Sequence, residues 1–368
     1  HNPGIYSGFK VKGAFGGSVP PEVTQQIEAM LKADTKPTAA TPGSITTFNP
    51  WQSYCDALRS MVDVGAIRAA ITEGKLTVFA DVMHGAAATG LEQILGIPVQ
   101  ELNSNRDPLF DGGAPEPLPR YLPALMAKLK GYQGSELAVG LVFDGDSDRV
   151  AAVDGKGNFL SSQVLIPILI EHLSTRRGYT GEVVKTISGS NLIPKVAALY
   201  NLSVHETPIG YKYIADRMLE APVLLGGEES GGIGYGHHIP ERDALLSALY
   251  VLEAIVQSGM DLSDQYARLQ QTTNFSSDYD RIDLPLASMD VRSRLLTQLQ
   301  TNPPKEIAGQ AVLDCLAIDG YKFQLADQSW LLIRFSGTEP VLRLYSEAAT
   351  ATEVQRNLKW AEEWANSI

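Results

Sequence analysis

The sequence predicts an α/β protein that ends in a separate, smaller α+β unit. Up to about residue 273, short apolar runs typical of buried strands alternate with helical patterns, and this alternation favours mostly parallel sheets. After residue 273, strand patterns lie close together and indicate an antiparallel sheet. At about 150 residues per domain, the 368 residues would make two or three domains, and smaller domains would allow four.

The first half of the chain shows the alternation clearly. The spacing of Val23, Ile27 and Met30 predicts a helix that starts after Pro21. The further elements expected here are a linker at 34–50, a helix from about 51 to 70, a strand at 76–81, a helix start at 84–88 and a strand at 138–143.

The second half continues the pattern and then changes. A helix at 243–256 is apolar on more than one face, so we expect it to be deeply packed. Before it we expect a strand at 183–185, a helix at 186–198 and a strand at 224–225. After residue 273 we expect strands at 279–284, 321–325, 331–335 and 341–346, with a helix after the first of them and another at the end.

The composition excludes several classes of protein. Hydrophobic residues make up 44% and charged residues 20%, so the chain can form buried cores. The formal net charge of −12 argues against a general nucleic-acid binder, and an anion would have to meet a local positive site. Cys55 and Cys315 exclude a disulfide scaffold and fit a reducing compartment, so we expect a cytoplasmic protein. The longest apolar run, at 164–170, is too short to cross a membrane.

Three carboxylates follow the predicted strand at 138–143. Asp144, Asp146 and Asp148 stand at alternate positions, and in a tight loop such side chains can converge on one hard cation. An EF-hand is excluded because Arg149 and Gly155 occupy the positions that need Gly and Glu. Mg²⁺ is favoured over Ca²⁺, since three carboxylates leave coordination positions for water or phosphate oxygen. The alternative is a solvated acidic turn, but the apolar strand before the loop favours the metal.

A glycine-rich segment at 226–236 holds six glycines in eleven residues. The spacing does not fit a dinucleotide fingerprint. Its polar residues Glu228, Glu229 and Ser230 supply acceptors and a hydroxyl that suit a sugar. A flexible glycine hinge remains the alternative.

The segment 334–343 lies between two apolar strands. Ser336, Gly337 and Thr338 can offer hydroxyls and backbone N–H groups to a phosphate, and Arg334 and Arg343 can clamp it. The alternative is an ordinary turn with surface arginines. Two further segments, the basic-aromatic loop 209–213 and the opening stretch with Lys10, carry little weight singly.

Together these five segments resemble the α-D-phosphohexomutases, the phosphoglucomutase/phosphomannomutase superfamily. The motifs are Asp-Gly-Asp-Ser-Asp-Arg, Gly-Glu-Glu-Ser-Gly and Arg-Phe-Ser-Gly-Thr-Glu-Pro, in the family's order, with matching stretches at 81–85, 110–117 and 240–243. The resemblance implies three α/β domains of mixed or parallel sheets flanked by helices, plus a smaller C-terminal α+β domain, around a central cleft. The implied domains are 1–47 (the remainder of a first α/β domain), 48–158 (with the metal loop), 159–273 (with the sugar-binding loop) and 274–368 (with the phosphate-binding loop).

The resemblance also implies roles for single residues. The implied catalytic residues are Lys10, which corresponds to the general acid/base, Arg149, which orients phosphoryl oxygens, and His1, which follows the nucleophile. The implied ligand sets are Asp144, Asp146 and Asp148 for Mg²⁺, Glu228, Ser230, Gly210, Tyr211 and Lys212 for the sugar, and Arg334, Ser336, Gly337, Thr338 and Arg343 for the phosphate.

The chain departs from the family pattern at its start. The family's nucleophile is a phosphoserine within Ser-His-Asn-Pro, whereas this chain begins at His-Asn-Pro. We therefore expect the serine immediately before His1, in a longer enzyme.

The expected function is that of a phosphoglucomutase. Such an enzyme interconverts glucose 1-phosphate and glucose 6-phosphate with Mg²⁺, through a phosphoserine and a glucose 1,6-bisphosphate intermediate. Glu-Glu-Ser resembles the glucose-type members. The alternatives are a phosphomannomutase or phosphoglucosamine-type mutase, and a non-catalytic sugar-phosphate-binding protein that lacks the nucleophile. In each case the partners are small hexose phosphates, with no membrane or nucleic acid.

Overall fold

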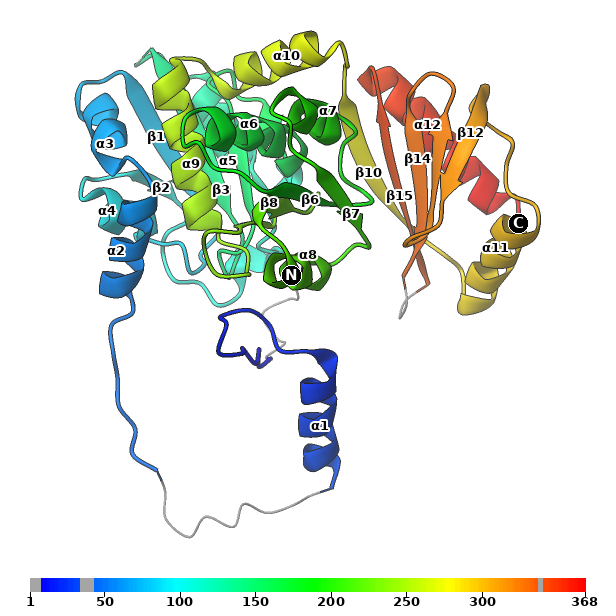
Figure 1. The fold of residues 1–368 in the computed structure, drawn as a ribbon, viewed down its shortest axis with the longest axis horizontal. Helices are drawn as coiled ribbons and strands as arrows, with labels where there is room; N and C mark the ends of the chain where they lie inside the picture. The colour runs from blue at the N-terminus through cyan, green and yellow to red at the C-terminus, as the bar shows by residue number, and fades with distance from the viewer. Residues whose placement is uncertain (1–7, 34–42, 135, 337–339) are drawn as a thin grey trace. The chain divides into compact units, whose positions relative to one another are not determined.

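The computed structural model describes residues 8–33, 43–134, 136–336 and 340–368 (Figure 1). The chain divides into two compact units. The first combines His1–Leu160 with Gly231–Asp261, and the second combines Ser161–Ser230 with Leu262–Ile368.

The first unit is built on a mixed sheet with the strand order β2-β1-β3-β4-β5. Strand β1 is parallel to both of its neighbours, β2 and β3, whereas β4 is antiparallel to β3 and β5 is antiparallel to β4. The carboxyl ends of β1 and β3 therefore meet at one edge, and residue 144 follows β3 there. The strands are β1 (Leu76–Asp81), β2 (Gln100–Leu102), β3 (Leu137–Phe143), β4 (Val150–Val153) and β5 (Phe159–Leu160), and β9 (Ile233–Tyr235) also belongs to this unit.

The helices of the first unit differ widely in burial. Twelve residues of α9 (Ala244–Ser258) are buried, which confirms the deeply packed helix expected there. By contrast, α1 (Pro21–Lys32) has no buried residue, and its apolar Leu31 is 76% exposed. The other helices are α2 (Trp51–Met61), α3 (Val64–Thr72), α4 (Gly90–Leu95) and α5 (Pro123–Lys130), with 3₁₀ turns η1 (Phe110–Gly112) and η2 (Pro119–Tyr121).

Two predicted helices of this unit are wrong. The single helix at 51–70 is two helices, because Val62 is extended and the Asp63 carboxylate accepts a hydrogen bond from the Ala66 N–H as the cap of α3. The helix start at 84–88 is a turn, and α4 begins only at Gly90. His84 and Thr89 have positive φ angles of 56° and 62°, which a right-handed helix does not accept.

The second unit begins with parallel strands in the order β7-β6-β8. The expected strand at 183–185 lies within β6, but the helix expected from 186 begins later, at Leu192. The elements are α6 (Ser162–Thr175), β6 (Glu182–Thr186), α7 (Leu192–Leu199), β7 (Val204–Thr207), α8 (Tyr211–Glu220), β8 (Val223–Gly227) and α10 (Leu262–Thr273).

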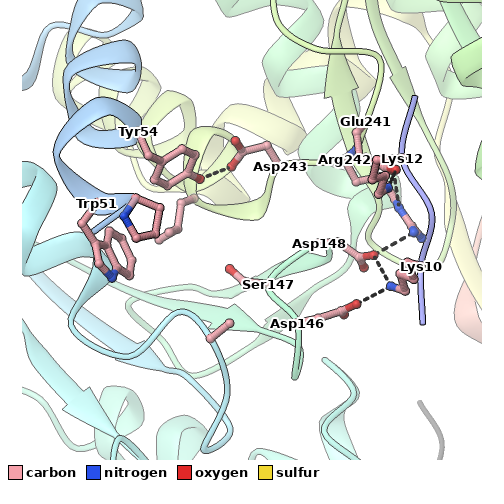
Figure 2. A pocket seen from close by; sticks show the side chains of 13 residues that line it. Lys10, Lys12, Trp51, Tyr54, Asp146, Ser147, Asp148, Glu241, Arg242 and Asp243 are labelled. Carbon is pink, nitrogen blue, oxygen red and sulfur yellow. Dashed lines mark hydrogen bonds and ion pairs between the residues drawn. The ribbon is translucent and has the colours of Figure 1, made fainter. Parts of the chain in front are cut away.

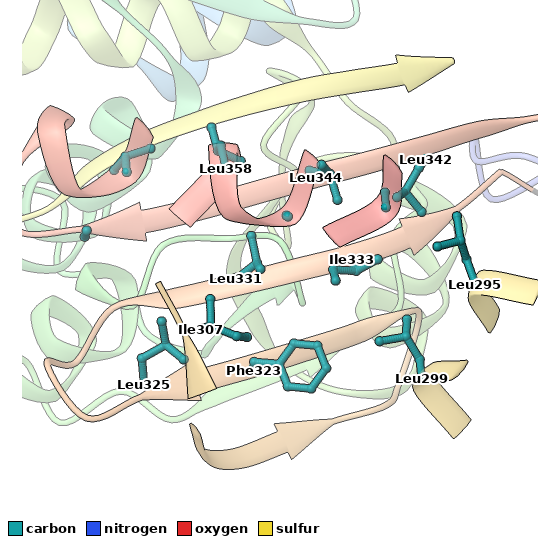
Figure 3. Packing of buried hydrophobic residues seen from close by; sticks show 14 residues of the cluster. Leu295, Leu299, Ile307, Phe323, Leu325, Leu331, Ile333, Leu342, Leu344 and Leu358 are labelled. Carbon is teal, nitrogen blue, oxygen red and sulfur yellow. The ribbon is translucent and has the colours of Figure 1, made fainter. Parts of the chain in front are cut away.

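The C-terminal part of this unit is a six-stranded sheet in which neighbouring strands are antiparallel. Leucines of two helices, Leu295 and Leu358 among them, cover one face of it and pack in one cluster with strand residues such as Phe323 (Figure 3). The predicted α+β unit is confirmed. Its elements are β10 (Asp278–Pro285), α11 (Met289–Thr301), β11 (Glu306–Ile307), β12 (Gln310–Leu316), β13 (Tyr321–Leu325), β14 (Trp330–Phe335), β15 (Val341–Ala348) and α12 (Ala351–Asn366).

The helices of the described ranges were compared with the length and composition of a membrane span. None of them is both long and apolar enough to cross a bilayer, and only the successive helices α9 and α10 together reach that length and composition.

Candidate active site

The three predicted carboxylates converge at the carboxyl end of β3. Each of Asp144, Asp146 and Asp148 can place an oxygen within 4.8 Å of the others. Asp144 is fully buried, and its Oδ1 accepts hydrogen bonds from the backbone N–H groups of Asp148 (2.9 Å) and Arg149 (3.1 Å). Asp144 thus closes the turn that carries the other two carboxylates.

A neighbouring backbone segment holds this metal loop, residues 144–149, in place. The Ala86 N–H donates to the carbonyl of Gly145 (3.0 Å), and the Gly145 N–H donates to the carbonyl of Pro115 (3.1 Å). A Cβ atom on Gly85 would lie only 2.5 Å from the Gly145 oxygen. Close approach of the two segments therefore requires glycine at position 85.

The electrostatics of the loop suit a bound cation. Burial raises the pKa of Asp148 to about 6, against the opposing effect of Arg242 and with reinforcement from the Asp144 and Asp146 charges. Burial also raises the pKa of Asp144. Asp148 Oδ1 is buried and has no hydrogen-bond donor among the described residues. A carboxylate oxygen without a donor, beside two further carboxylates, fits a hard divalent cation.

Cationic side chains lie against the same carboxylates (Figure 2). Lys10 Nζ is 2.5 Å from Asp146 Oδ2 and 3.8 Å from Asp148 Oδ2, and the hydrogen bond to Asp146 raises the pKa of Lys10. Arg149 Nε lies 3.6 Å from Asp144 Oδ2. Arg242, to which no sequence motif assigned a role, lies 2.7 Å from Asp148 Oδ2. The structure therefore brings together Lys10, Arg149 and all three predicted metal ligands.

A cavity of about 570 Å³ opens beside the metal loop. Its polar side is formed by Lys10, Asp146, Asp148 and Arg242, and aromatic side chains, including Trp51, line another part (Figure 2). This volume lies in the range of small-molecule sites.

The predicted sugar-binding loop follows β8 in the second unit. The Ser162 hydroxyl donates to the carbonyl of Glu228 (2.8 Å), and Glu228 is buried. The Glu229 carboxylate accepts hydrogen bonds from the hydroxyls of Ser188 (2.6 Å) and Thr186 (3.3 Å), at the end of β6. These contacts hold the loop at the sheet edge and leave Ser230 half-buried at its end.

The loop 209–213 precedes and opens α8. Gly210 has a φ of 132°, which favours glycine. The ring of Tyr211 packs with Ile214 in a buried cluster, so this side chain is part of the hydrophobic core. Lys212 is exposed, and its Nζ lies 4.6 Å from the centre of the Tyr213 ring.

The arginines of the predicted phosphate-binding loop stand on neighbouring strands. Arg334 in β14 lies directly opposite Arg343 in β15. Arg334 Nε donates to Asp319 Oδ2 (3.0 Å), and the same oxygen accepts from the Ile209 N–H (3.1 Å). Asp319 therefore connects this arginine to loop 209–213, a role that no local sequence signal indicated.

The remaining predicted residues of the site differ in what can be described. Ser336 is buried, and its carbonyl accepts a hydrogen bond from Arg292 Nε (2.9 Å). Arg343 Nε is buried without a hydrogen-bond partner among the described residues. Gly337, Thr338 and His1 lie outside the described residues.

Three family models match most of the chain. The model described as "Phosphoglucomutase/phosphomannomutase, alpha/beta/alpha domain II" matches residues 52–157. The corresponding domain III model matches residues 161–272, and the C-terminal domain model matches residues 296–359.

Curated relatives cover nearly the whole chain. A protein assigned as a phosphoglucosamine mutase in Methanothermobacter thermautotrophicus is 29% identical over 95% of this chain and 73% of its own length. The phosphoglucomutase/phosphomannomutase of Thermococcus kodakarensis is 26% identical over 98% of this chain and 75% of its own length.

Solved structures agree with this fold. A crystal structure of a protein assigned as a phosphomannomutase in Thermus thermophilus has a TM-score of 0.81, with 29% identity over 96% of this chain and 74% of that chain. The N-acetylphosphoglucosamine mutase of Aspergillus fumigatus, in complex with GlcNAc-6P and magnesium, has a TM-score of 0.56. It is 14% identical and covers 88% of this chain and 67% of that chain.

Proposed function

Because the chain belongs to the phosphoglucomutase/phosphomannomutase family, we propose that it moves a phosphoryl group between two hydroxyl oxygens of one hexose phosphate. The observation that carries this proposal is the cluster of Asp144, Asp146 and Asp148 with Lys10 against it. Phosphoryl transfer depends mainly on positioning and charge compensation, and this cluster offers both.

The site residues of the first unit have separate roles in this proposal. Asp144, Asp146 and Asp148 would hold Mg²⁺, which supplies stabilisation of negative charge on the transferred group. Lys10 Nζ lies beside the carboxylates and would exchange a proton with the sugar hydroxyl. The Arg149 guanidinium would orient phosphoryl oxygens, because its Nε is short of a hydrogen-bond acceptor among the described residues.

The second unit would bind the rest of the substrate. Arg334 and Arg343 are paired across two strands and would hold the phosphate that is not reacting. The Glu228 carboxylate would accept hydrogen bonds from sugar hydroxyls, and the Ser230 hydroxyl would donate a hydrogen bond to one of them. The nucleophile in this proposal is the serine expected before His1, with a hexose 1,6-bisphosphate as intermediate and activator.

The names of the relatives favour the aminosugar and mannose alternatives over a glucose-specific enzyme. The sequence argument for glucose rested on Glu-Glu-Ser. Hydrogen bonds from Ser188 and Thr186 give Glu229 a positioning task that does not depend on the sugar. We therefore propose that glucosamine phosphate is the preferred substrate and that mannose phosphate is the next best.

A substrate panel tests this proposal. The protein carrying the serine expected before His1 is assayed with Mg²⁺ and the 1-phosphates of glucosamine, mannose and glucose, each with its 1,6-bisphosphate. We expect the highest kcat/KM for glucosamine 1-phosphate and no turnover when that serine is replaced by alanine. A tenfold preference for glucose 1-phosphate would restore the glucose-specific interpretation. Binding of all three without turnover would favour the non-catalytic binding protein.

A further inference from the structure

Arg242 contacts Asp148 of the metal loop and directly precedes the N-cap residue of α9. Its neighbour Asp243 is buried and caps α9 by accepting a hydrogen bond from the Leu246 N–H (2.9 Å). Asp243 also accepts a hydrogen bond from the Tyr54 hydroxyl (2.8 Å). The backbone that carries Arg242 is therefore fixed next to the loop, and the Arg242 side chain is only 18% exposed.

The two oxygens of Asp148 have different surroundings (Figure 2). Oδ2 lies 2.7 Å from Arg242 Nη2 and 3.8 Å from Lys10 Nζ. Oδ1 is buried and has no hydrogen-bond partner among the described residues, and Arg149 Nε is 3.8 Å from it. Among the described residues, Oδ1 is thus the oxygen of Asp148 that no hydrogen bond occupies.

We propose that Arg242 makes Asp148 a one-oxygen ligand and thereby favours Mg²⁺ over Ca²⁺ in the metal loop. The inference rests on the proposed Mg²⁺ site. Mg²⁺ is small, requires near-octahedral geometry and keeps several waters, so single carboxylate oxygens suit it. Ca²⁺ is larger and accepts both oxygens of a carboxylate. A guanidinium held on Oδ2 blocks that second contact and fixes the plane of the carboxylate.

Arg242 is therefore a positioning residue that acts through Asp148. Substitution of a residue that orients a metal ligand costs about ten- to a hundredfold in metal affinity. Removal of the guanidinium would lower Mg²⁺ affinity through lost orientation. The same removal would free Oδ2 for Ca²⁺, so the ratio of the two affinities separates this role from general support of the loop.

Calorimetric titration with Mg²⁺ and with Ca²⁺ tests the proposal on the chain 1–368. In Arg242→Ala we expect Mg²⁺ affinity to fall about tenfold and Ca²⁺ affinity to change less than about threefold. Arg242→Lys keeps a donor and a charge near Oδ2, so it should restore much of the Mg²⁺ preference. The matched control is Lys12→Gln, because Lys12 lines the same cavity but is paired with Glu241 and not with the three aspartates. The control should leave the ratio unchanged.

Each outcome decides a different point. Equal losses for both cations in Arg242→Ala would overturn the proposal, and so would an unchanged or tighter Mg²⁺ affinity. Arg242→Gln, which lacks the reach of arginine, carries the same test should the alanine variant not fold. Asp146→Asn locates the site. Two results would overturn the proposed metal site: no Mg²⁺ binding by the unsubstituted chain, or Mg²⁺ binding that persists in Asp146→Asn. Either result would overturn the role of Arg242 as well.

Discussion

Two sets of parallel strands in this molecule have the same topology and different chemistry. In the first unit, β1 lies between β2 and β3, and in the second unit, β6 lies between β7 and β8. The last strand of each set ends at a loop with predicted function, Asp144–Arg149 after β3 and Glu228–Ser230 after β8. Carboxyl ends of parallel strands are common places for ligands.

The side chains at the two edges differ in charge. At the first edge, buried Asp81 and Asp144 have pKa values that burial raises, and two more carboxylates lie beside Asp144. At the second edge, the carboxylates of Glu228 and Glu229 are accompanied by two buried lysines, Lys185 of β6 and Lys322 of strand β13. Lys185 pairs with Glu206, and Lys322 donates a hydrogen bond to the carbonyl of Ile187 (2.8 Å). Topology therefore selects the place of a site, whereas its side chains select the chemistry.

The largest expected effect is on the first edge. Asp146→Asn should lower Mg²⁺ affinity at least about a hundredfold, because a direct ligand contributes more than a residue that merely orients one. The fold should be kept, since the Asp146 side chain is 42% exposed. Calorimetry gives the affinity, and thermal unfolding checks the fold. Glu229→Gln, at the second edge, is the control that should leave Mg²⁺ binding unchanged. Unaltered Mg²⁺ affinity in Asp146→Asn would remove the chemical difference between the two edges.

The next effect concerns the buried amines of the second edge. Burial lowers the pKa of Lys322 from 10.5 to about 7, and the nearby Lys185 charge adds to this. Between pH 7 and pH 10.5, the Lys322 amine is protonated in the unfolded chain and neutral in the folded chain. The cost to stability is therefore complete below about pH 7 and vanishes as the pH rises through 10.5.

Lys322→Met removes this cost. Relative to the unsubstituted chain, the variant should gain about 3 kcal/mol more in free energy of unfolding at pH 6 than at pH 9.5. Denaturant unfolding at both pH values measures the difference. Lys359→Met is the matched control, because Lys359 is 74% exposed and should show no such pH dependence. A gain of equal size at both pH values would show that Lys322 carries no buried-charge penalty.

Strands were more predictable than helix ends. The strands at 76–81 and 321–325 have the predicted bounds, because the first has a run of buried apolar residues and the second alternates aromatic or aliphatic residues with polar ones. The prediction of one helix at 51–70 was wrong at Asp63, because this residue caps the start of α3 and interrupts the helical periodicity. The strand β12 was missed although Ala311, Val312 and Leu313 are apolar, and Leu313 is 70% exposed, so burial on this strand does not follow the apolar residues.

The site shows the same limit. Asp144, Asp146 and Asp148 could be predicted because they stand together in the sequence, directly after an apolar strand. Arg242 and Asp319 could not be predicted, since each acts on a residue far away in the chain, on Asp148 and on Ile209 respectively. Local patterns carry no information on such contacts, which arise only when the strands and loops have packed.

A smaller effect is expected at the paired arginines. Arg343→Ala should weaken binding of hexose phosphates about tenfold or more, because one charge-assisted hydrogen bond contributes about 1.5–3 kcal/mol. Binding of the unphosphorylated sugar should hardly change. Arg356→Ala is the control, since Arg356 is exposed and pairs with Asp327. Calorimetry with both ligands measures the two losses, and equal losses would contradict a phosphate-binding role for Arg343.

The smallest expected effect tests how the metal loop is held. A Cβ on Gly85 would lie 2.5 Å from the Gly145 oxygen, so Gly85→Ala must push the loop away from its neighbouring segment. The carboxylates remain, and only their spacing changes, so Mg²⁺ affinity should fall about fivefold rather than vanish. Gly43→Ala is the matched control, because a Cβ there meets no atom within 4 Å. Mg²⁺ titration of the two variants measures this effect. Equal Mg²⁺ affinities would mean that the loop keeps its shape without the Gly85 contact, through the Asp144 hydrogen bonds alone.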